Sequence, residues 1–189
     1  SWHKPAQTST TRSYKAGFDP LNVETVLDLV TVGGPYVIPG KDDIAMALAP
    51  GGGNARLLFR EGGAPSPATR LDWNTFEIQK GSPSKLVPAS PNPGEVKLKV
   101  TAGIGTTFTP GTTGAFQGSF KLVDSDTSVS PAKDLTRSSS FLGMIVDDGS
   151  GPAGYGFFNL AEMPTASPKT TPTTTRMLSG RVELTDTLP

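Results

Sequence analysis

The sequence contains no cysteine and a single histidine, His3. The absence of cysteine excludes disulfide scaffolds, cysteine nucleophiles and Cys/His zinc sites. His3 lies in a polar N-terminal stretch, where no rigid scaffold would hold the imidazole beside a nucleophile as a Ser-His-Asp triad requires. We therefore predict no catalytic residues, no cofactor and no enzymatic activity.

Charge is also scarce and balanced. The 189 residues include 17 Lys plus Arg and 17 Asp plus Glu, so the formal net charge is zero. A nucleic-acid binder needs clustered Lys and Arg to displace phosphate counterions, so direct contact with nucleic acid is not expected. No apolar run reaches the roughly 18 residues of a membrane span. The first twenty residues also lack the basic-then-apolar pattern of a secretory signal, and we expect no membrane association.

Turn-forming residues are abundant instead. The chain has 22 Gly and 18 Pro, which is close to the level at which disorder is considered. The nine Phe are nevertheless spread along the chain and the apolar residues form patterned clusters, unlike those of a disordered tract. Turn sequences separate short segments whose apolar residues recur at every second position. Examples of these turns are Gly33-Gly34-Pro35, Pro91–Gly94 and Asp148-Gly149.

The clearest strand is Glu95–Thr101, in which Val96, Leu98 and Val100 alternate with polar residues. This is the pattern of a half-buried antiparallel strand. Related patterns predict further strands, and these cover residues 44–48, 55–60, 71–78, 116–122, 141–146, 155–160 and 178–184.

These segments define a fold class. Asp19-Pro20, followed by apolar residues at helical spacing, predicts a short helix or turn that leads into a strand ending near Val32. Residues 164–175 form a Thr/Pro-rich loop. About eight or nine strands with Gly/Pro punctuation are typical of a β-sandwich, jelly roll or barrel. We predict an all-β fold, an antiparallel β-sandwich or jelly roll with at most one or two short helices. Residues 1–15 form a polar N-terminal arm, and residues 16–189 a single domain.

Paired aspartates are the candidate cation ligands. Asp124-Ser125-Asp126 and Asp147-Asp148 are the best clusters, and Asp42-Asp43 is a third. Hard cations bind where several carboxylate and carbonyl oxygens converge. The EF-hand pattern is absent, however, and loop aspartates commonly hydrogen-bond their own backbone in turns. We predict no metal site, while calcium binding by either of the first two pairs stays open.

Two other motifs have simpler interpretations. Gly103-Ile104-Gly105 resembles the start of a nucleotide loop, but Phe108 stands where the third glycine belongs, and we interpret these glycines as turn or bulge positions. Asp72 beside Trp73 is the nearest approach to a sugar cleft with an acidic catalyst. We interpret it as a core tryptophan with a solvent-facing neighbour.

One resemblance to a known family stands at the C-terminus. The stretch Met177–Pro189 contains Ser179-Gly180-Arg181-Val182-Glu183-Leu184. It resembles the closing strand of coat proteins of small icosahedral plant RNA viruses, which often has the form small-Gly-Arg-aliphatic-x-Leu. Chain length, lack of cysteine and abundant Ser, Thr, Gly and Pro are similar to those of such capsid or protruding domains. The resemblance implies a basic RNA-binding arm, which this sequence does not contain, whereas a projecting surface domain needs none.

The first functional hypothesis is therefore a structural virion protein, either a capsid subunit or a surface-projecting domain, located in the virion. It would self-assemble or bind other virion subunits and contact a host surface receptor. Phe108, Phe141 and Phe157-Phe158 would be buried either between subunits or in the core. The alternative is a secreted adhesin or carbohydrate-binding β-sandwich, in which exposed aromatics such as Trp73 or Tyr36 stack on a ligand.

Overall fold

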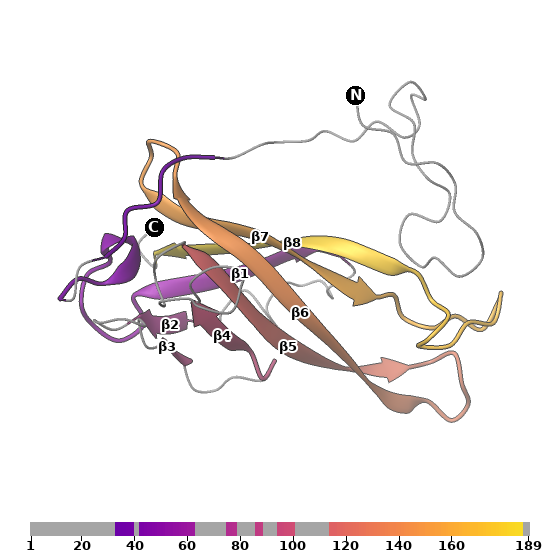
Figure 1. Cartoon of the computed structure of the whole chain (residues 1–189). Coiled ribbons are helices and arrows are strands. Elements are labelled where there is room, and N and C mark those ends of the chain that lie inside the picture. Colours follow the sequence, from indigo (N-terminus) through magenta and orange to yellow (C-terminus); the bar gives the residue numbers. More distant parts are fainter. Residues whose placement is uncertain are drawn as a thin grey trace, which may run out of the picture.

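The computed structural model describes a sheet-rich body (Figure 1). The described residues are 33–39, 42–62, 75–78, 86–88, 94–100 and 114–186. Their elements are a short 3-10 turn and eight strands: η2 (Ala45–Ala47), β1 (Ala55–Glu61), β2 (Thr75–Ile78), β3 (Leu86–Pro88), β4 (Lys97–Val100), β5 (Ala115–Asp126), β6 (Lys133–Asp147), β7 (Pro152–Ala161) and β8 (Met177–Asp186). These strands form one antiparallel sheet in the order β3-β2-β1-β8-β7-β6-β5-β4.

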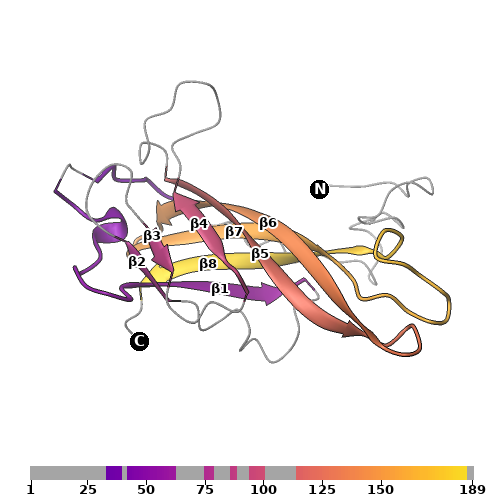
Figure 2. The same cartoon turned by 90° about the horizontal axis from the view of Figure 1, so that it is seen from below.

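The sheet is strongly curved. Strands β1 and β5 are separated by β8, β7 and β6, so a flat sheet would place them about 19 Å apart at roughly 4.8 Å per strand. The ring centroids of Phe59 on β1 and Phe120 on β5 are nevertheless only 4.8 Å apart. Strands β3 and β4, at the two ends of the order, also lie close together (Figure 2). The sheet thus wraps around its concave face, and its five longest strands form a half-barrel.

Glycines opposite phenylalanines make this curvature possible. Three buried phenylalanines each face a glycine on the neighbouring strand, and the pairs are Phe141–Gly118, Phe116–Gly143 and Phe158–Gly180. A Cβ atom at any of these glycines would overlap the opposing ring. Each ring therefore occupies the space that a side chain would otherwise take, which lets the concave face close around a dense aromatic core.

The concave face supplies the hydrophobic core. Along β1 and β8, Leu57, Phe59, Val182 and Leu184 are fully or almost fully buried. On β6 the buried residues alternate with exposed ones over most of the strand. The prediction of an all-β antiparallel fold is confirmed. A two-sheet sandwich or jelly roll is not confirmed, because the described strands follow one another in a single hydrogen-bonded sheet.

Most predicted strands are present. The segments predicted at 55–60, 116–122, 155–160 and 178–184 correspond to β1, β5, β7 and β8. The one predicted at 141–146 is the C-terminal half of β6, which begins at Lys133. Its N-terminal half was missed because its residues are mostly polar and paired in a ribbon with β5. The predicted loop at 164–175 is confirmed as turns and one isolated bridge.

Residues 44–48 were predicted as a strand, and this is wrong. The segment contains η2, in which Met46 and Ala47 have left-handed φ values of 64° and 52°. Ile44, Ala45 and Met46 are consecutive and all buried. The left-handed backbone at Met46 and Ala47 is incompatible with an extended strand, and the turn brings all three side chains to the core.

Some predictions lie outside the described residues. They concern the arm at 1–15, the helix at 19–30, His3, Asp72-Trp73, Gly103–Gly105 and Phe108. Within the described ranges, no helix has the length and hydrophobicity that a membrane span needs.

Candidate functional site

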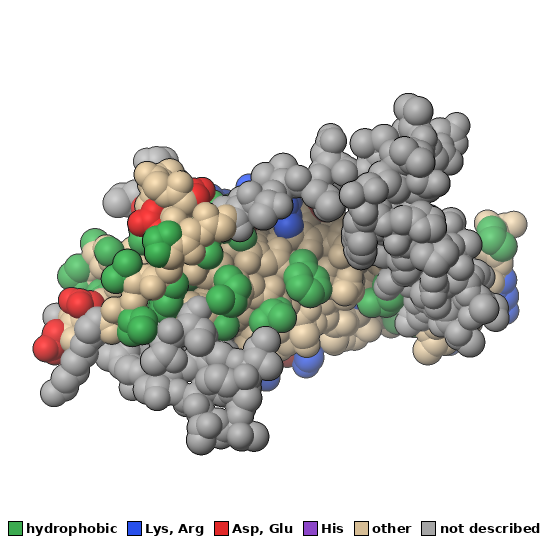
Figure 3. Space-filling view, turned by 45° about the horizontal axis from the view of Figure 1, so that its top comes forward, with side chains coloured by type: hydrophobic (Ala, Val, Ile, Leu, Met, Phe, Trp, Pro, Cys, Tyr) green, Lys and Arg blue, Asp and Glu red, His purple; other side chains and the backbone are tan. Residues whose placement is uncertain are grey.

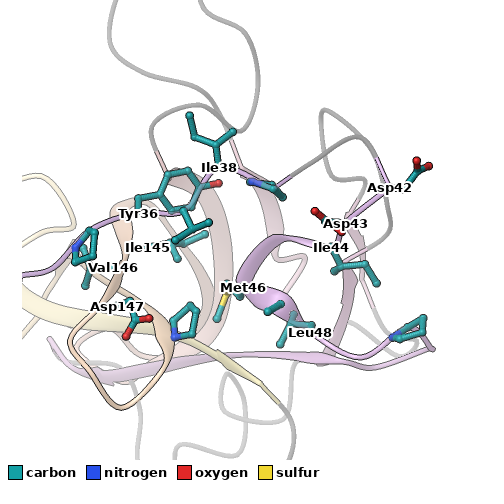
Figure 4. Close-up of a pocket in the computed structure, with 16 residues that line it drawn as sticks. Tyr36, Ile38, Asp42, Asp43, Ile44, Met46, Leu48, Ile145, Val146 and Asp147 are labelled. Carbon is teal, nitrogen blue, oxygen red and sulfur yellow. The ribbon is translucent and has the colours of Figure 1, made fainter.

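A cavity of about 680 Å³ lies at the end of the sheet where β6 turns into β7 (Figure 4). Three stretches of chain line it: residues 35–39, residues 42–50 around η2, and residues 145–152 at the β6–β7 turn. Cavities of about 300–1,000 Å³ are typical of small-molecule sites. Its size and mixed lining make it the candidate site for a ligand.

Residues 35–39, which form the first wall of the cavity, are fixed to the end of β6. The backbone N–H of Asp147 donates a hydrogen bond to the carbonyl oxygen of Pro35, with an N···O distance of 3.0 Å. Gly34 lies so close to the backbone of Asp147 that a Cβ atom there would overlap it. Residues 35–39 therefore run beside the β6–β7 turn, as Figure 1 shows.

Residues 42–50 around η2 form the second wall of the cavity. Asn54, directly before β1, holds this wall in place. Its side-chain amide donates to the carbonyl oxygens of Ala49 and Ile78, at 2.9 and 3.0 Å. Its Oδ1 accepts a hydrogen bond from the backbone N–H of Ile78 at 2.8 Å. One side chain thus ties the loop after η2 to β2. The buried residues Ile44 and Met46 anchor the same loop to the core.

Tyr36 is the polar residue of interest inside the cavity. Its side chain is half-buried, and its ring lies against Gly114. Figure 4 shows Tyr36, Ile38 and Ile145 on the same side of the cavity. The Tyr36 hydroxyl is buried and has no hydrogen-bond partner among the described residues. Burial also raises the pKa of Tyr36, so the phenol stays protonated and remains a hydrogen-bond donor.

Three carboxylates also line the cavity, those of Asp42, Asp43 and Asp147. No Lys or Arg stands among the described lining residues. The Asp147 carboxylate accepts a hydrogen bond from the N–H of Gly149 at 2.9 Å, and this closes the β6–β7 turn. The charge at the cavity therefore disfavours an anionic ligand.

The aspartate pairs serve turns and one ion pair. Asp148 accepts hydrogen bonds from the N–H and Oγ of Ser150, and these bonds lower the pKa of Asp148. Asp126 accepts two bonds from Ser128 in the same way. Asp124 instead pairs with the guanidinium of Arg137. Among the described residues, no three His, Asp or Glu side chains gather closely enough to hold a metal ion.

A second feature lies on the convex face of the sheet. Leu142, Met144 and Phe157 are exposed by 43, 46 and 52%. Leu142 lies opposite Phe157 across β6 and β7, and Met144 lies opposite the partly buried Tyr155. We call these four residues the outer apolar patch. Figure 3 shows hydrophobic side chains exposed on a face of the molecule.

Opposite charges border this patch on β8. Arg181 lies opposite Phe157, and Glu183 lies opposite Tyr155. The Arg181 Nε and a Glu183 carboxylate oxygen are 3.4 Å apart. The border of the patch therefore carries one cation and one anion side by side.

The phenylalanines named from the sequence divide between the two faces. Phe141 and Phe158 are buried in the core, so the core interpretation is confirmed for them and burial between subunits is wrong. Phe157 is exposed within the outer apolar patch. Sequence reasoning missed Leu142 and Met144. The signal was present, because residues 141–146 are apolar at consecutive positions and so supply apolar side chains to both faces.

Comparison with known proteins adds no relative. No family model matches the chain, and neither a curated protein nor a solved structure is significantly similar to it. The functional argument therefore stands on the residues and their geometry.

Proposed function

We propose that this protein is a non-enzymatic structural component of a virion, a capsid subunit or surface-projecting domain that assembles through the convex face of its sheet. The observation that carries the proposal is the outer apolar patch. An antiparallel sheet with one solvated face normally keeps apolar residues on the buried side. Contiguous exposed apolar side chains instead mark surfaces that bind another protein.

A second copy of the chain is the partner that suits this face. The chain has a formal net charge of zero, so two copies do not repel each other strongly. In an isologous interface the same patch meets itself, and Arg181 of one copy is able to face Glu183 of the other. Burial of exposed Leu, Met and Phe side chains contributes at roughly 25 cal/mol per Å² of apolar area.

The virion setting follows from the sequence resemblance. The stretch that carries the resemblance includes β8, a central strand that pairs with both β1 and β7. The proposal requires one continuous antiparallel sheet and does not depend on a second sheet. The jelly-roll fold stays a prediction. Contact with a host surface receptor is part of the same proposal.

Sedimentation velocity over a range of protein concentrations tests the assembly. The parent protein is expected to form dimers or larger species, and the double variant Leu142→Ser/Phe157→Ser is expected to be monomeric. The matched control is Val123→Ser, because Val123 is also about half exposed but lies on β5 outside the patch. A parent that stays monomeric at high concentration, or a patch variant that assembles as the parent does, would overturn the proposal. Electron microscopy of the assembled species then shows whether closed or regular particles form.

The carbohydrate-binding alternative stays a prediction. Trp73, one of its two aromatics, lies outside the described residues. Tyr36, the other, is half-buried at a largely apolar cavity and does not form an exposed platform. Saturable glycan binding by a strictly monomeric protein would favour this alternative over assembly.

A further inference from the structure

The four methionines of the chain differ in exposure. Met46 is only 7% exposed in the core, Met163 and Met177 are partly buried, and Met144 is 46% exposed within the outer apolar patch. We propose that Met144 is a modification site, and that its oxidation to the sulfoxide by a peroxide reverses assembly through this patch. This inference rests on the proposed function, because it assigns a regulation to the same face.

Met144 is the sulfur group that a peroxide in solution reaches first. The sequence contains no cysteine, so the methionine thioethers are the sulfur atoms that a peroxide oxidises. The sulfur lone pair attacks one oxygen of hydrogen peroxide, and an S–O bond forms as the O–O bond breaks. The second oxygen leaves as water after proton transfer, so the thioether is oxidised and the peroxide is reduced. This reaction needs direct contact with the sulfur, and exposure therefore favours Met144.

The position of Met144 places its sulfur inside the expected interface. Met144 shares the convex face with Leu142 on β6 and lies directly opposite Tyr155 on β7. Residues paired in this way across an antiparallel sheet have Cβ atoms within about 5.5 Å of each other. When two patches meet, the sulfur is surrounded by apolar groups. A sulfoxide oxygen there loses its hydrogen bonds to water without gaining others, which opposes association.

The same modification leaves the fold intact. The side chains that β6 contributes to the core are those of Phe141 and Ile145, on the opposite face from Met144. Met46, the methionine within the core cluster, is protected by its burial. Oxidation at Met144 therefore changes what the convex face binds and does not unfold the protein. Methionine sulfoxide reductases restore the thioether, so the change is reversible.

Limited treatment with hydrogen peroxide, followed by peptide mass spectrometry, tests the site. At a protein concentration where the parent is monomeric, Met144 is expected to be oxidised several-fold faster than Met163 and Met177, and Met46 most slowly. At a concentration where the parent assembles, oxidation of Met144 alone is expected to slow several-fold. Oxidation of Met144 no faster than that of Met46 would overturn the inference.

Sedimentation velocity before and after oxidation tests the consequence. Complete oxidation of Met144 is expected to raise the dissociation constant of the parent assembly about tenfold or more, the effect of one polar group buried without a partner. Met144→Leu keeps an apolar side chain that peroxide does not oxidise, and it is expected to assemble before and after treatment. Met163→Leu is the matched control and is expected to stay as sensitive as the parent. Far-ultraviolet circular dichroism of the oxidised parent is expected to be unchanged.

The inference and the proposed function fail in different ways. A parent that is monomeric at high concentration before any peroxide is added overturns the assembly proposal and this inference with it. A parent that assembles equally well after Met144 is fully oxidised overturns this inference alone. The same holds if Met144→Leu loses assembly on oxidation as the parent does. Recovery of assembly after treatment of the oxidised parent with methionine sulfoxide reductases A and B supports both.

Discussion

The guanidinium of Arg137 on β6 and the carboxylate of Asp124 on β5 form an ion pair within the sheet. The Nε and Nη2 atoms of Arg137 donate to Oδ2 of Asp124 at 3.0 and 2.8 Å. The Nη1 atom donates to the carbonyl oxygen of Ala161 on β7 at 2.7 Å. Backbone pairing between β6 and β7 has already ended at Phe141 and Phe158. The Arg137 side chain therefore joins β7 to the paired strands β5 and β6 at a point where the backbone ladder between β6 and β7 has ended.

Removal of the charge on Asp124 should be strongly destabilising. The Arg137 side chain is only 4% exposed, so Asp124→Asn would leave a buried cation without its counterion. A loss of about 3–5 kcal/mol in the free energy of unfolding is expected. Urea denaturation at neutral pH measures this as a lower transition midpoint.

Two comparisons make that result specific. Glu162 holds Arg176 with two hydrogen bonds on the exposed surface, and Glu162→Gln should cost less than about 1 kcal/mol. The double variant Arg137→Met/Asp124→Leu should recover much of the lost stability, because it removes both charges. Equal losses for Asp124→Asn and Glu162→Gln would show that the buried pair has no special role.

Replacement of Gly143 by alanine should also be costly. The ring of Phe116 occupies the position that the new Cβ would take, and the backbone of Tyr155 lies close by. Overpacking of this kind costs about 1–3 kcal/mol. Gly52→Ala is the control, since nothing lies within 4 Å of a Cβ there. Thermal unfolding followed by circular dichroism should show a lower Tm for Gly143→Ala alone, and a similar change in both variants would refute the packing argument.

Substitution of Tyr36 by phenylalanine should stabilise the ligand-free protein. The buried hydroxyl loses its contact with water on folding without gaining a partner in the described part of the chain, so its removal should raise the free energy of unfolding by about 1 kcal/mol. Tyr155→Phe is the matched control. Burial and the nearby charge of Asp148 raise the pKa of Tyr155, and its hydroxyl is not among the buried unpaired groups of the described residues, so the control should gain no stability. A less stable Tyr36→Phe variant, measured by urea denaturation, would show that the hydroxyl has a partner after all.

The Glu162–Arg176 contact should be sensitive to acid. Hydrogen bonding from Arg176 holds the pKa of Glu162 below its ordinary value of 4.5. A carboxyl group with a lowered pKa in the folded state stabilises the fold above its ordinary pKa, and this contribution is lost as the pH falls through the lowered value. The small stability difference between the parent and Glu162→Gln should therefore be present at about pH 6 and disappear in acid. A difference that persists or grows on acidification would contradict this linkage.

The candidate site shows how far sequence reasoning reaches. Tyr36 was named as a ligand-contacting aromatic, and it does line the cavity, although as a half-buried residue rather than an exposed one. The cavity itself was not foreseen, because it forms between residues 35–39 and 42–50 on one side and residues 145–152 on the other, about a hundred positions apart in the chain. The Arg137–Asp124 pair was missed for a related reason. Asp124 was considered as a calcium ligand, and its partner is positioned only by the register of β5 and β6.

The all-β character and most of the strands were determined by local sequence, because a side chain's face in a strand depends only on whether its position is odd or even. The curvature was decided by tertiary structure. The sequence shows that three apolar residues, Phe116, Phe141 and Phe158, are present. Only the strand register places each of them opposite a glycine, with its ring in the core on the concave face. The same register places Leu142 and Phe157 together on the convex face. Alternation is a property of neighbouring residues, whereas curvature, cavities and interfaces depend on contacts between strands that are distant in sequence.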